Sequence, residues 1–349
     1  MPMLEEQVDD VNDMVPRGDK RRLLGRPRQQ TFLRVASAYG IVFLFVAILI
    51  LFSTLPASAS TFASLANLRS LINGQAVVMM IAVAMVIPLL SGNIDLTVGA
   101  TAGLTSVVIA TCVTRYHFSL VLAVSVGLVC AIAVGLVNGF LVARITADSF
   151  VITFGMQTLI AGLLIWYTNS LPVVSDLPAA FVDFSDQTWF GVPRLLLVLV
   201  IVIALAVIIQ DRTPYGRHLQ AIGSNERAAR LVGIPVQRTV FVSFVISAFT
   251  AGLAGIVLTA RSGGAVPSAG PSFLFPAFAA VFLGMAMIRP GKPNMLGTVV
   301  AVAFVSASVS GFTMLGASAW VQDVFNGAAL VIAISMATLF ARKQGARRT

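Results

Sequence analysis

The residues best suited to chemistry in this chain are side-chain amides that lie beside a glycine inside or next to apolar stretches. Four such sites supply the candidate pathway residues Asn73, Gln75, Asn93, Asn138 and Asn326. A side-chain amide donates and accepts hydrogen bonds without bringing a charge into lipid, and glycine lets a neighbouring backbone approach closely. A single amide most often bonds another helix. Four sites together favour a hydrated path for a neutral solute rich in hydroxyl groups.

Asp95 is the carboxylate closest in sequence to these amides, and we add it to the candidate pathway residues. A carboxylate is costly near the bilayer centre unless it is paired or caps a helix. Because Asp95 stands at the start of a predicted helix, we expect it to cap the first free amides of that helix. In the alternative, a deeper Asp95 is the titrating group of a proton-coupled secondary transporter.

Residue patterns that would make the chain an enzyme are missing from the sequence. It contains no nucleophile elbow, no His-Glu-x-x-His pair and only two histidines. Gly291-Lys292 is not a phosphate loop, because Ala286 stands where a glycine is required and Pro293 follows the lysine. Cys112 and Cys130 both lie in apolar runs, where a thiol acts as a small core residue. We expect no catalytic residues, metal or bound cofactor in this chain.

The elements that must position these residues are apolar helices of membrane length. Of the 349 residues, 58% are hydrophobic and 11% are charged, a composition that predicts an all-α polytopic membrane protein. The apolar runs predict ten transmembrane helices, at residues 35–55, 68–90, 95–114, 119–143, 148–169, 193–210, 238–260, 272–288, 296–315 and 320–341. The predicted domains are a disordered cytoplasmic tail at 1–34, a transmembrane domain at 35–341 with a cytoplasmic loop at 211–237, and a basic cytoplasmic tail at 342–349.

The distribution of basic residues predicts the orientation of the chain. The net charge of +9 would suggest nucleic-acid binding in a soluble domain, but here the Lys and Arg residues stand in the gaps between apolar runs, so we expect no nucleic-acid partner. With ten crossings and a cytoplasmic amino terminus, the 23 Lys and Arg residues are cytoplasmic with four exceptions, Arg69, Arg115, Arg194 and Arg261. Both termini are then cytoplasmic.

One long polar segment, residues 211–238, carries helix signals of its own. Either Ser224 or Asn225 can cap a short helix over residues 226 to 231, and Gly233 supplies a left-handed stop just before a proline. A two-turn helix without a core is marginal in water. We therefore expect this helix to dock onto another protein at the membrane face.

Two motifs in the sequence resemble the permease subunits of ABC importers for ribose, xylose, arabinose and related sugars. These are SGNIDLTVGA at 91–100 and TPYGRHLQAIGSNERAARLVGI at 213–234. Further similarity lies in SFVITFGMQTLIAG at 149–162 and AGLAGIVLTARSGGAVPSAG at 251–270, so the resemblance covers most of residues 68–340. The stretch at 283–294 departs from the sugar-permease pattern, which indicates either a different solute or a changed cytoplasmic contact.

The resemblance implies the ABC importer permease fold, with about ten transmembrane helices and a short cytoplasmic coupling helix, in the bacterial cytoplasmic membrane. It implies that the chain imports a monosaccharide or related polyol, using ATP bound and hydrolysed by partner subunits. The implied partners are cytoplasmic ABC ATPase subunits, a periplasmic or surface-tethered sugar-binding protein, and a second permease copy in a homodimer. It also implies a set of ATPase-coupling residues, Glu226, Arg227, Ala228, Ala229 and Arg230. The rival hypotheses are the proton-coupled transporter and a membrane scaffold or channel subunit.

Overall fold

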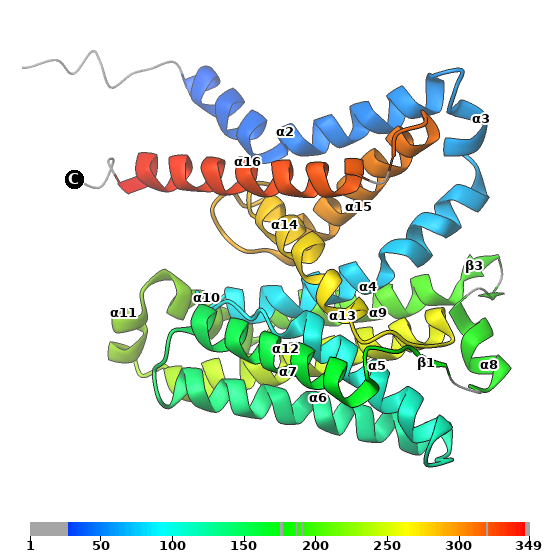
Figure 1. Ribbon diagram of the computed structural model, residues 1–349. Helices are drawn as coiled ribbons and strands as arrows, with labels where there is room; N and C mark the ends of the chain where they lie inside the picture. Colours follow the sequence, from blue (N-terminus) through cyan, green and yellow to red (C-terminus); the bar gives the residue numbers. More distant parts are fainter. Residues whose placement is uncertain (1–26, 175–176, 186, 190, 319, 346–349) are drawn as a thin grey trace, which may run out of the picture.

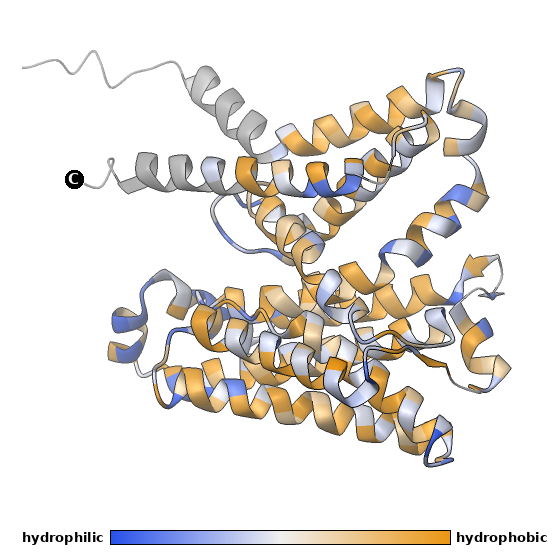
Figure 2. Cartoon of the chain, in the orientation of Figure 1, coloured by the Kyte–Doolittle hydropathy of each residue, from blue (hydrophilic) through white to orange (hydrophobic). Residues whose placement is uncertain are grey.

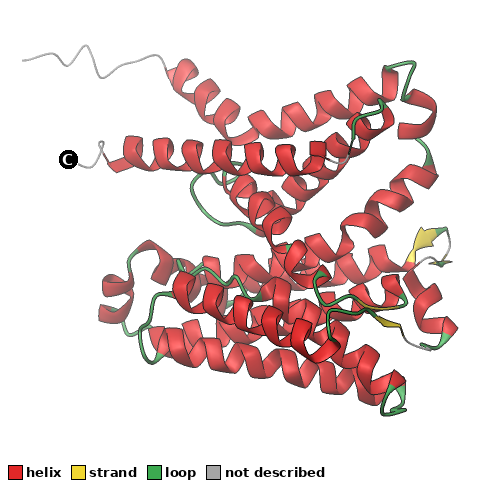
Figure 3. Cartoon of the chain, viewed as in Figure 1, coloured by secondary structure: helices red, strands yellow, loops and turns green. Residues whose placement is uncertain are grey.

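The computed structural model describes residues 27–174, 177–185, 187–189, 191–318 and 320–345, and helices account for most of them (Figure 3). The long and intermediate helices are α2 (Pro27–Thr54), α4 (Leu65–Leu89), α5 (Val98–Thr114), α6 (Leu120–Ala143), α7 (Ser149–Thr168), α9 (Arg194–Arg212), α10 (Pro214–Ser224), α12 (Val236–Ser262), α14 (Leu274–Met285), α15 (Met295–Met314) and α16 (Trp320–Gly345). The short elements are α3 (Ala59–Phe62), β1 (Val173–Val174), α8 (Ala179–Val182), η1 (Asp183–Ser185), β2 (Thr188–Trp189), β3 (Val192–Pro193), α11 (Glu226–Leu231), β4 (Gly264–Ala265) and α13 (Ala269–Ser272).

Among the described residues, six helices are long and apolar enough to cross a membrane: α4, α6, α7, α9, α12 and α15. Three apolar stretches are shorter, namely the part of α2 from Tyr39, α5, and α13 together with α14. The chain is therefore a multi-pass helical membrane protein, and ten crossings remain a prediction. The predicted helix at 272–288 is divided into α13 and α14, and the 12 residues of α14 extend about 18 Å, less than the thickness of a bilayer core.

The helices at both ends of the described chain extend past the predicted boundaries of the two tails. Helix α2 begins at Pro27, inside the segment predicted to be disordered, and residues 1–26 lie outside the described part. Proline is favourable at the first helical position, and the arginine and glutamines after it are good helix formers, so a polar composition does not prevent a helix here. For the same reason α16 continues to Gly345, into the predicted basic tail, of which residues 346–349 are not described.

Helix α4 is the central element of the fold. In Figure 1 it lies between one group of helices, α2, α14, α15 and α16, and a second group that contains α5, α6, α7, α9 and α12. It packs against α9 and α12 on one side and against α14 and α15 on the other. Every residue from Ala76 to Leu89 except Met79 is buried. A helix that is apolar around its whole circumference can be enclosed in this way, because it offers no polar face to solvent.

The second group is held together by close backbone contacts at small residues. At Gly255 of α12, an added Cβ would lie 2.4 Å from the carbonyl oxygen of Ala102 on α5. At Gly135 of α6, an added Cβ would lie 2.8 Å from the carbonyl oxygen of Phe244 on α12. Small residues let helix backbones approach and gain dispersion contacts where lipid supplies no hydrophobic driving force.

The bundle has two distinct ends in Figure 1. The helix α11, the described start of α2 and the described end of α16 lie at the left, which we call the α11 end. The strands lie at the right, which we call the strand end, where β1 pairs antiparallel with β4 and β2 pairs with β3. In Figure 2 most residues of the long helices are hydrophobic, whereas hydrophilic residues are concentrated near α11 and in loops at the two ends of the bundle.

We predict that Gly255→Ala lowers the stability of the folded protein by about 1–3 kcal/mol, because the added methyl group overpacks the α5–α12 contact. The measurement is a fluorescence-detected size-exclusion melting curve in detergent. Gly155→Ala is the matched control, since an added Cβ on this glycine of α7 meets nothing within 4 Å. The control should be neutral or gain roughly 0.5–1 kcal/mol from the higher helix propensity of alanine. Equal melting temperatures for the two variants would contradict the packing account.

Candidate functional site

Asp95 lies at the centre of a buried hydrogen-bond network in the α4–α5 loop, residues 90–97. Its side chain is buried, with a relative exposure of 1%. One carboxylate oxygen accepts the backbone N–H of Thr97 at 3.0 Å and the Thr97 hydroxyl at 2.6 Å, and the other accepts the Ser247 hydroxyl at 2.8 Å. The predicted helix start at residue 95 is wrong, since α5 begins at Val98 with Thr97 as its N-cap residue, so Asp95 does not cap the first free amides of this helix as expected. The carboxylate instead holds the turn that enters α5. It also ties that turn to the middle of α12.

Asn138 extends the same network to α6. Its side-chain N–H₂ donates to the Thr97 hydroxyl at 3.0 Å, so this predicted pathway residue makes the helix-to-loop bond that is the commoner use of a buried amide. The Asn138 side chain is fully buried, and its carbonyl oxygen has no hydrogen-bond partner among the described residues. Asn138 and Asp95 thus belong to one structural connection between α5, α6 and α12.

The α4–α5 loop is also bonded to α7. The Ile94 backbone N–H donates to the Ser149 hydroxyl at 3.1 Å, and the Thr153 hydroxyl donates to the Ile94 carbonyl at 3.2 Å. Sequence analysis did not identify Ser149, Thr153, Thr97 or Ser247 as important. Isolated hydroxyl residues in apolar helices usually bond their own backbone, so a single serine or threonine gives no signal of a distant partner.

The polar segment forms two helices, where the sequence predicted one. Helix α11 spans Glu226–Leu231 as expected, and of the two possible caps Asn225 is the one used, since its side chain accepts the Ala228 N–H at 3.0 Å. Gly233 has a left-handed backbone with φ of +82°, which ends the helix as predicted. The additional helix, α10, begins after Thr213, whose hydroxyl accepts the Gly216 N–H at 3.1 Å.

The predicted coupling residues do not all face outward. Glu226, Arg227, Ala228 and Arg230 are exposed, and Glu226 forms an ion pair with Arg230 one turn later. Ala229 is buried, with 4% exposure, and packs in the same cluster as Ile222 and Val236. Ala229 therefore packs α11 against α10 and α12. Successive residues of a helix point in different directions around its axis, so at least one of five consecutive residues faces the rest of the protein.

Two apolar residues that sequence analysis missed are the most exposed part of this helix. Leu231 is 89% exposed and Val232 is 76% exposed, and both stand at the end of α11, beyond the membrane-length helices. These two apolar side chains are not buried against their own chain, and exposed apolar groups of this kind are typical of a surface that contacts another protein. The sequence does contain a Leu-Val pair inside the polar segment. Whether these side chains are buried or exposed depends on where α11 ends, and the sequence pattern alone did not show this.

The helices α10 and α11 rest on the α4–α5 loop and are joined to the α14–α15 loop. An added Cβ on Gly223, near the end of α10, would lie 2.3 Å from the carbonyl oxygen of Leu90, so the two backbones are in direct contact. In the last turn of α9, just before α10, Asp211 makes a two-bond ion pair with Arg289, with N–O distances of 2.8 and 3.2 Å. Arg289 belongs to the 283–294 stretch that departs from the sugar-permease pattern, so this stretch has a contact with the coupling segment.

The remaining pathway residues fall at two other places. Gln75 of α4 and Asn326 of α16 line one small pocket together with Gln322 and Ser306, so the structure brings these amides together as a polar group. Asn73 lies on α4 beside this region and is half-buried. Asn93 lies apart from all of them, in a cavity of about 160 Å³ at the α11 end that Glu226 and Arg230 also line. The six predicted residues therefore lie at three separate places in a single chain.

In the described residues no group of three or more His, Cys, Asp or Glu side chains could hold a metal ion. The arrangement instead connects an exposed helix, through backbone contacts and buried hydrogen bonds, to the helices around α4. It can transmit a displacement of α11 into the bundle.

Comparisons with known proteins give a consistent family. Residues 67–334 match the family profile described as branched-chain amino acid transport system / permease component. The ribose import permease of Bacillus subtilis strain 168 is 34% identical over 269 residues, which cover 77% of this chain and 83% of that protein. The ribose import permease of Escherichia coli K12 is 30% identical, with 83% and 91% covered. The autoinducer 2 import system permease protein of Yersinia pseudotuberculosis is 30% identical, with 73% and 78% covered. No solved structure shows a significant match.

We predict that Asp95→Ala strongly destabilises the protein, whereas Asp95→Asn does not. Alanine leaves the Thr97 N–H, the Thr97 hydroxyl and the Ser247 hydroxyl without their acceptor, at about 1–3 kcal/mol for each buried group. Asparagine keeps an oxygen for Thr97 and can donate to the Ser247 hydroxyl, which also accepts. The measurement is the melting temperature in detergent.

The same pair of variants separates a structural Asp95 from a titrating one. If Asp95→Asn is as stable as the parent but abolishes uptake, the carboxylate charge is needed for transport and the structural account is wrong. If uptake follows stability across both variants, Asp95 is a positioning residue.

Proposed function

The chain belongs to the branched-chain amino acid transport system / permease component family, and we propose that it is the permease subunit of an ABC importer that carries a monosaccharide or related polyol across the bacterial cytoplasmic membrane. ATP is bound and hydrolysed by partner subunits. The observation that carries this proposal is the exposed apolar tip of α11, Leu231 and Val232, on a helix that contacts the core of the bundle.

A sugar or polyol is favoured over an amino acid by the chemistry inside the bundle. The pocket between α4, α14, α15 and α16 has a volume of about 10 Å³, so it is proposed as one polar point on the solute path and not as a closed solute site. Among valines and a proline it presents two glutamines, one asparagine and one serine, and no charged residue. An amino acid at neutral pH carries a carboxylate and an ammonium group, which would need charged or dipolar partners, whereas neutral amides suit hydroxyl groups. Two of the relatives compared above are named for ribose import and the third for autoinducer 2 import. The proposed solute class is therefore a monosaccharide or a related polyol.

The α11 end is proposed to be cytoplasmic. The polar segment and the described ends of α2 and α16 lie on this side, which suits an even number of crossings. The four basic residues expected outside lie toward the strand end and have local partners: Arg69 and Arg261 donate to backbone carbonyls, and Arg115 and Arg194 lie over aromatic rings. Such contacts reduce the cost of placing these charges against the positive-inside rule.

The geometry suggests how ATP hydrolysis moves the bundle. Closure of the ATPase pair displaces α11 through Leu231 and Val232, and α10 moves with it because Ala229 packs inward. The Gly223–Leu90 contact passes the displacement to the α4–α5 loop. That loop is bonded to α6, α7 and α12, while the Asp211–Arg289 pair links the end of α9, which leads directly into α10, to the loop before α15. Both groups around α4 are therefore reached from one exposed helix.

We propose a second permease copy and a sugar-binding protein outside the membrane as further partners. Within one chain the candidate pathway residues lie at three separate places, so a continuous path requires surfaces from another copy, in a homodimer. A proton-coupled carrier is not favoured, because the family is one of ABC permeases and Asp95 has hydrogen bonds to both oxygens.

We predict that Leu231→Ser weakens assembly with the cognate ATPase subunits while the permease stays folded, since the Leu231 side chain packs against little of its own chain. The measurement is co-purification of the ATPase with the tagged permease, together with ATP-driven uptake in proteoliposomes. Leu171→Ser is the matched control, because Leu171 is also largely exposed, at 66%, but stands after α7 at the strand end. Undiminished ATPase binding and uptake in the Leu231 variant would remove the docking role of α11.

We predict that a cysteine placed at position 225 reacts with a membrane-impermeant maleimide only after the cells are permeabilised, because the α11 end is cytoplasmic. Asn225 is exposed at the start of α11, whereas the native Cys112 is buried. A cysteine at position 171, at the strand end, should react in intact cells. The reverse pattern would overturn both the orientation and the proposed ATPase contact.

A further inference from the structure

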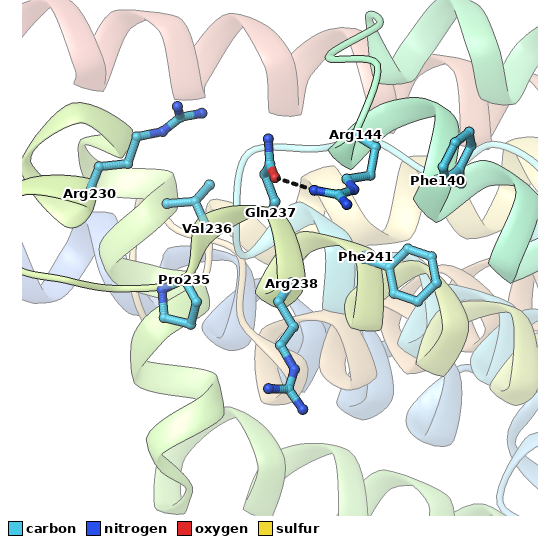
Figure 4. A pocket seen from close by; sticks show the side chains of 8 residues that line it. All are labelled: Phe140, Arg144, Arg230, Pro235, Val236, Gln237, Arg238 and Phe241. Atoms are coloured by element: carbon cyan, nitrogen blue, oxygen red, sulfur yellow. Dashed lines mark hydrogen bonds between the residues drawn. The ribbon is translucent and has the colours of Figure 1, made fainter.

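A cavity of about 650 Å³ opens at the α11 end, where the end of α6 meets the start of α12 (Figure 4). None of the steps described above uses it. Its polar lining is dominated by three arginines, Arg144, Arg230 and Arg238, and its apolar lining includes Phe140 and Phe241. Figure 4 shows Arg144 directed toward Gln237 and Arg238 directed away from both, with the two phenylalanine rings on the far side of Arg144 from Arg230.

The positive charge of this cavity is only partly compensated. Arg230 is paired with Glu226, whereas Arg144 donates to the neutral Gln237 side chain at 3.2 Å. Neither Arg144 nor Arg238 forms an ion pair with any acidic residue that the structure describes. The nearby carboxylate of Asp148 is used as the cap of α7, where it accepts the Val151 N–H. Two uncompensated guanidinium groups that share one cavity favour an anionic occupant with several oxygen acceptors.

The backbone at the cavity adds to this preference. Helix α12 has 27 residues and begins here at Val236, after Pro235, and no side chain caps it. The first N–H groups of a helix have no intrahelical acceptor, and the helix dipole places partial positive charge at this end. These groups strengthen an anion site that the arginines already define.

The apolar side of the cavity continues into a face that only lipid or another membrane protein can cover. Phe140 is 52% exposed, and the exposed apolar residues Val129, Leu136 and Val137 follow it along α6. In Figure 2 this helix is hydrophobic over most of its length along the edge of the bundle. The arginines thus stand at the end of an apolar helix face, and a lipid whose acyl chain lay along this face would bring its headgroup to them.

We propose that this cavity binds the phosphate group of an anionic phospholipid, with Arg144 as the ligating residue, Arg238 adding positive charge from another part of the cavity lining, and Phe140 and Phe241 beside the first part of an acyl chain. Arg230 of α11 lies at the rim of the same cavity, so a bound lipid connects the coupling helix to α6 and α12. Anionic lipid then stabilises the arrangement from which α11 operates. The site does not depend on which solute the chain carries.

The experiment measures lipid binding to the purified full-length chain after delipidation in neutral detergent. Phosphatidylglycerol, phosphatidylcholine and inorganic phosphate are titrated separately, with the melting temperature and native mass spectrometry as readouts. Phosphatidylglycerol should raise the melting temperature saturably and give a one-to-one adduct, and phosphatidylcholine should do neither. The Arg144→Gln/Arg238→Gln double variant should lose at least about tenfold in affinity. Arg144→Lys/Arg238→Lys should retain part of it, because lysine keeps the charge without the planar fork.

The matched control is Arg212→Gln/Arg217→Gln, which removes the same charge from exposed positions at the α11 end outside the cavity. Equal loss of lipid affinity in both double variants would show general electrostatic attraction and overturn the site. Equal stabilisation by inorganic phosphate would identify a soluble anion instead of a lipid. Loss of ATPase assembly by the Arg144/Arg238 variant in phosphatidylcholine alone would show that the cavity receives a partner's carboxylate, which would also overturn the proposal. The melting temperature without lipid confirms folding of every variant.

Discussion

Backbone and side-chain polar groups inside a membrane bundle must be satisfied by the protein itself, because lipid offers no hydrogen-bond partners. The α4–α5 loop meets this constraint at the most demanding place in the chain, where non-helical backbone is buried between helices. Asp95 satisfies three donors there, and Asn138, Ser149 and Thr153 supply the remaining bonds. The loop is consequently bonded to three helices, α6, α7 and α12, so a displacement of the loop also displaces these helices.

Because this loop is held firmly by the bundle, a movement of the exposed helix α11 can be passed on to the transmembrane helices. A two-turn helix in water has little stability of its own, and α11 persists because Asn225 caps it and Ala229 packs inward. Its neighbour α10 meets the loop through backbone atoms at Gly223 and Leu90, a contact that has no flexible side chain to absorb a displacement. Closely packed interfaces of this kind shift between discrete arrangements more readily than they deform.

The electrostatics of the α11 end follow a different rule from those of the core. In the bundle, uncharged amides and hydroxyls surround Asp95, the one buried carboxylate among the residues that the structure describes, because charge is expensive inside a membrane bundle. At the α11 end, arginines accumulate under the positive-inside rule, and only Arg230 and Arg289 have acidic partners among the residues described. The excess of Arg144 and Arg238 beside an exposed apolar face is what such a surface needs in order to hold an anionic lipid.

The sequence by itself determined the class of protein, the apolar helices, the family resemblance and the limits of α11, because these depend on local composition and on short-range signals such as helix caps and helix-stopping glycines. Only the tertiary structure decided which partners those residues have. The Ser247–Asp95 bond joins residues 152 positions apart, and isolated hydroxyls in apolar helices gave no sign of it. The inward turn of Ala229, the exposure of Leu231 and the separation of the six pathway residues likewise depend on how helices far apart in sequence pack around α4, and single-sequence periodicity carries no information on that packing.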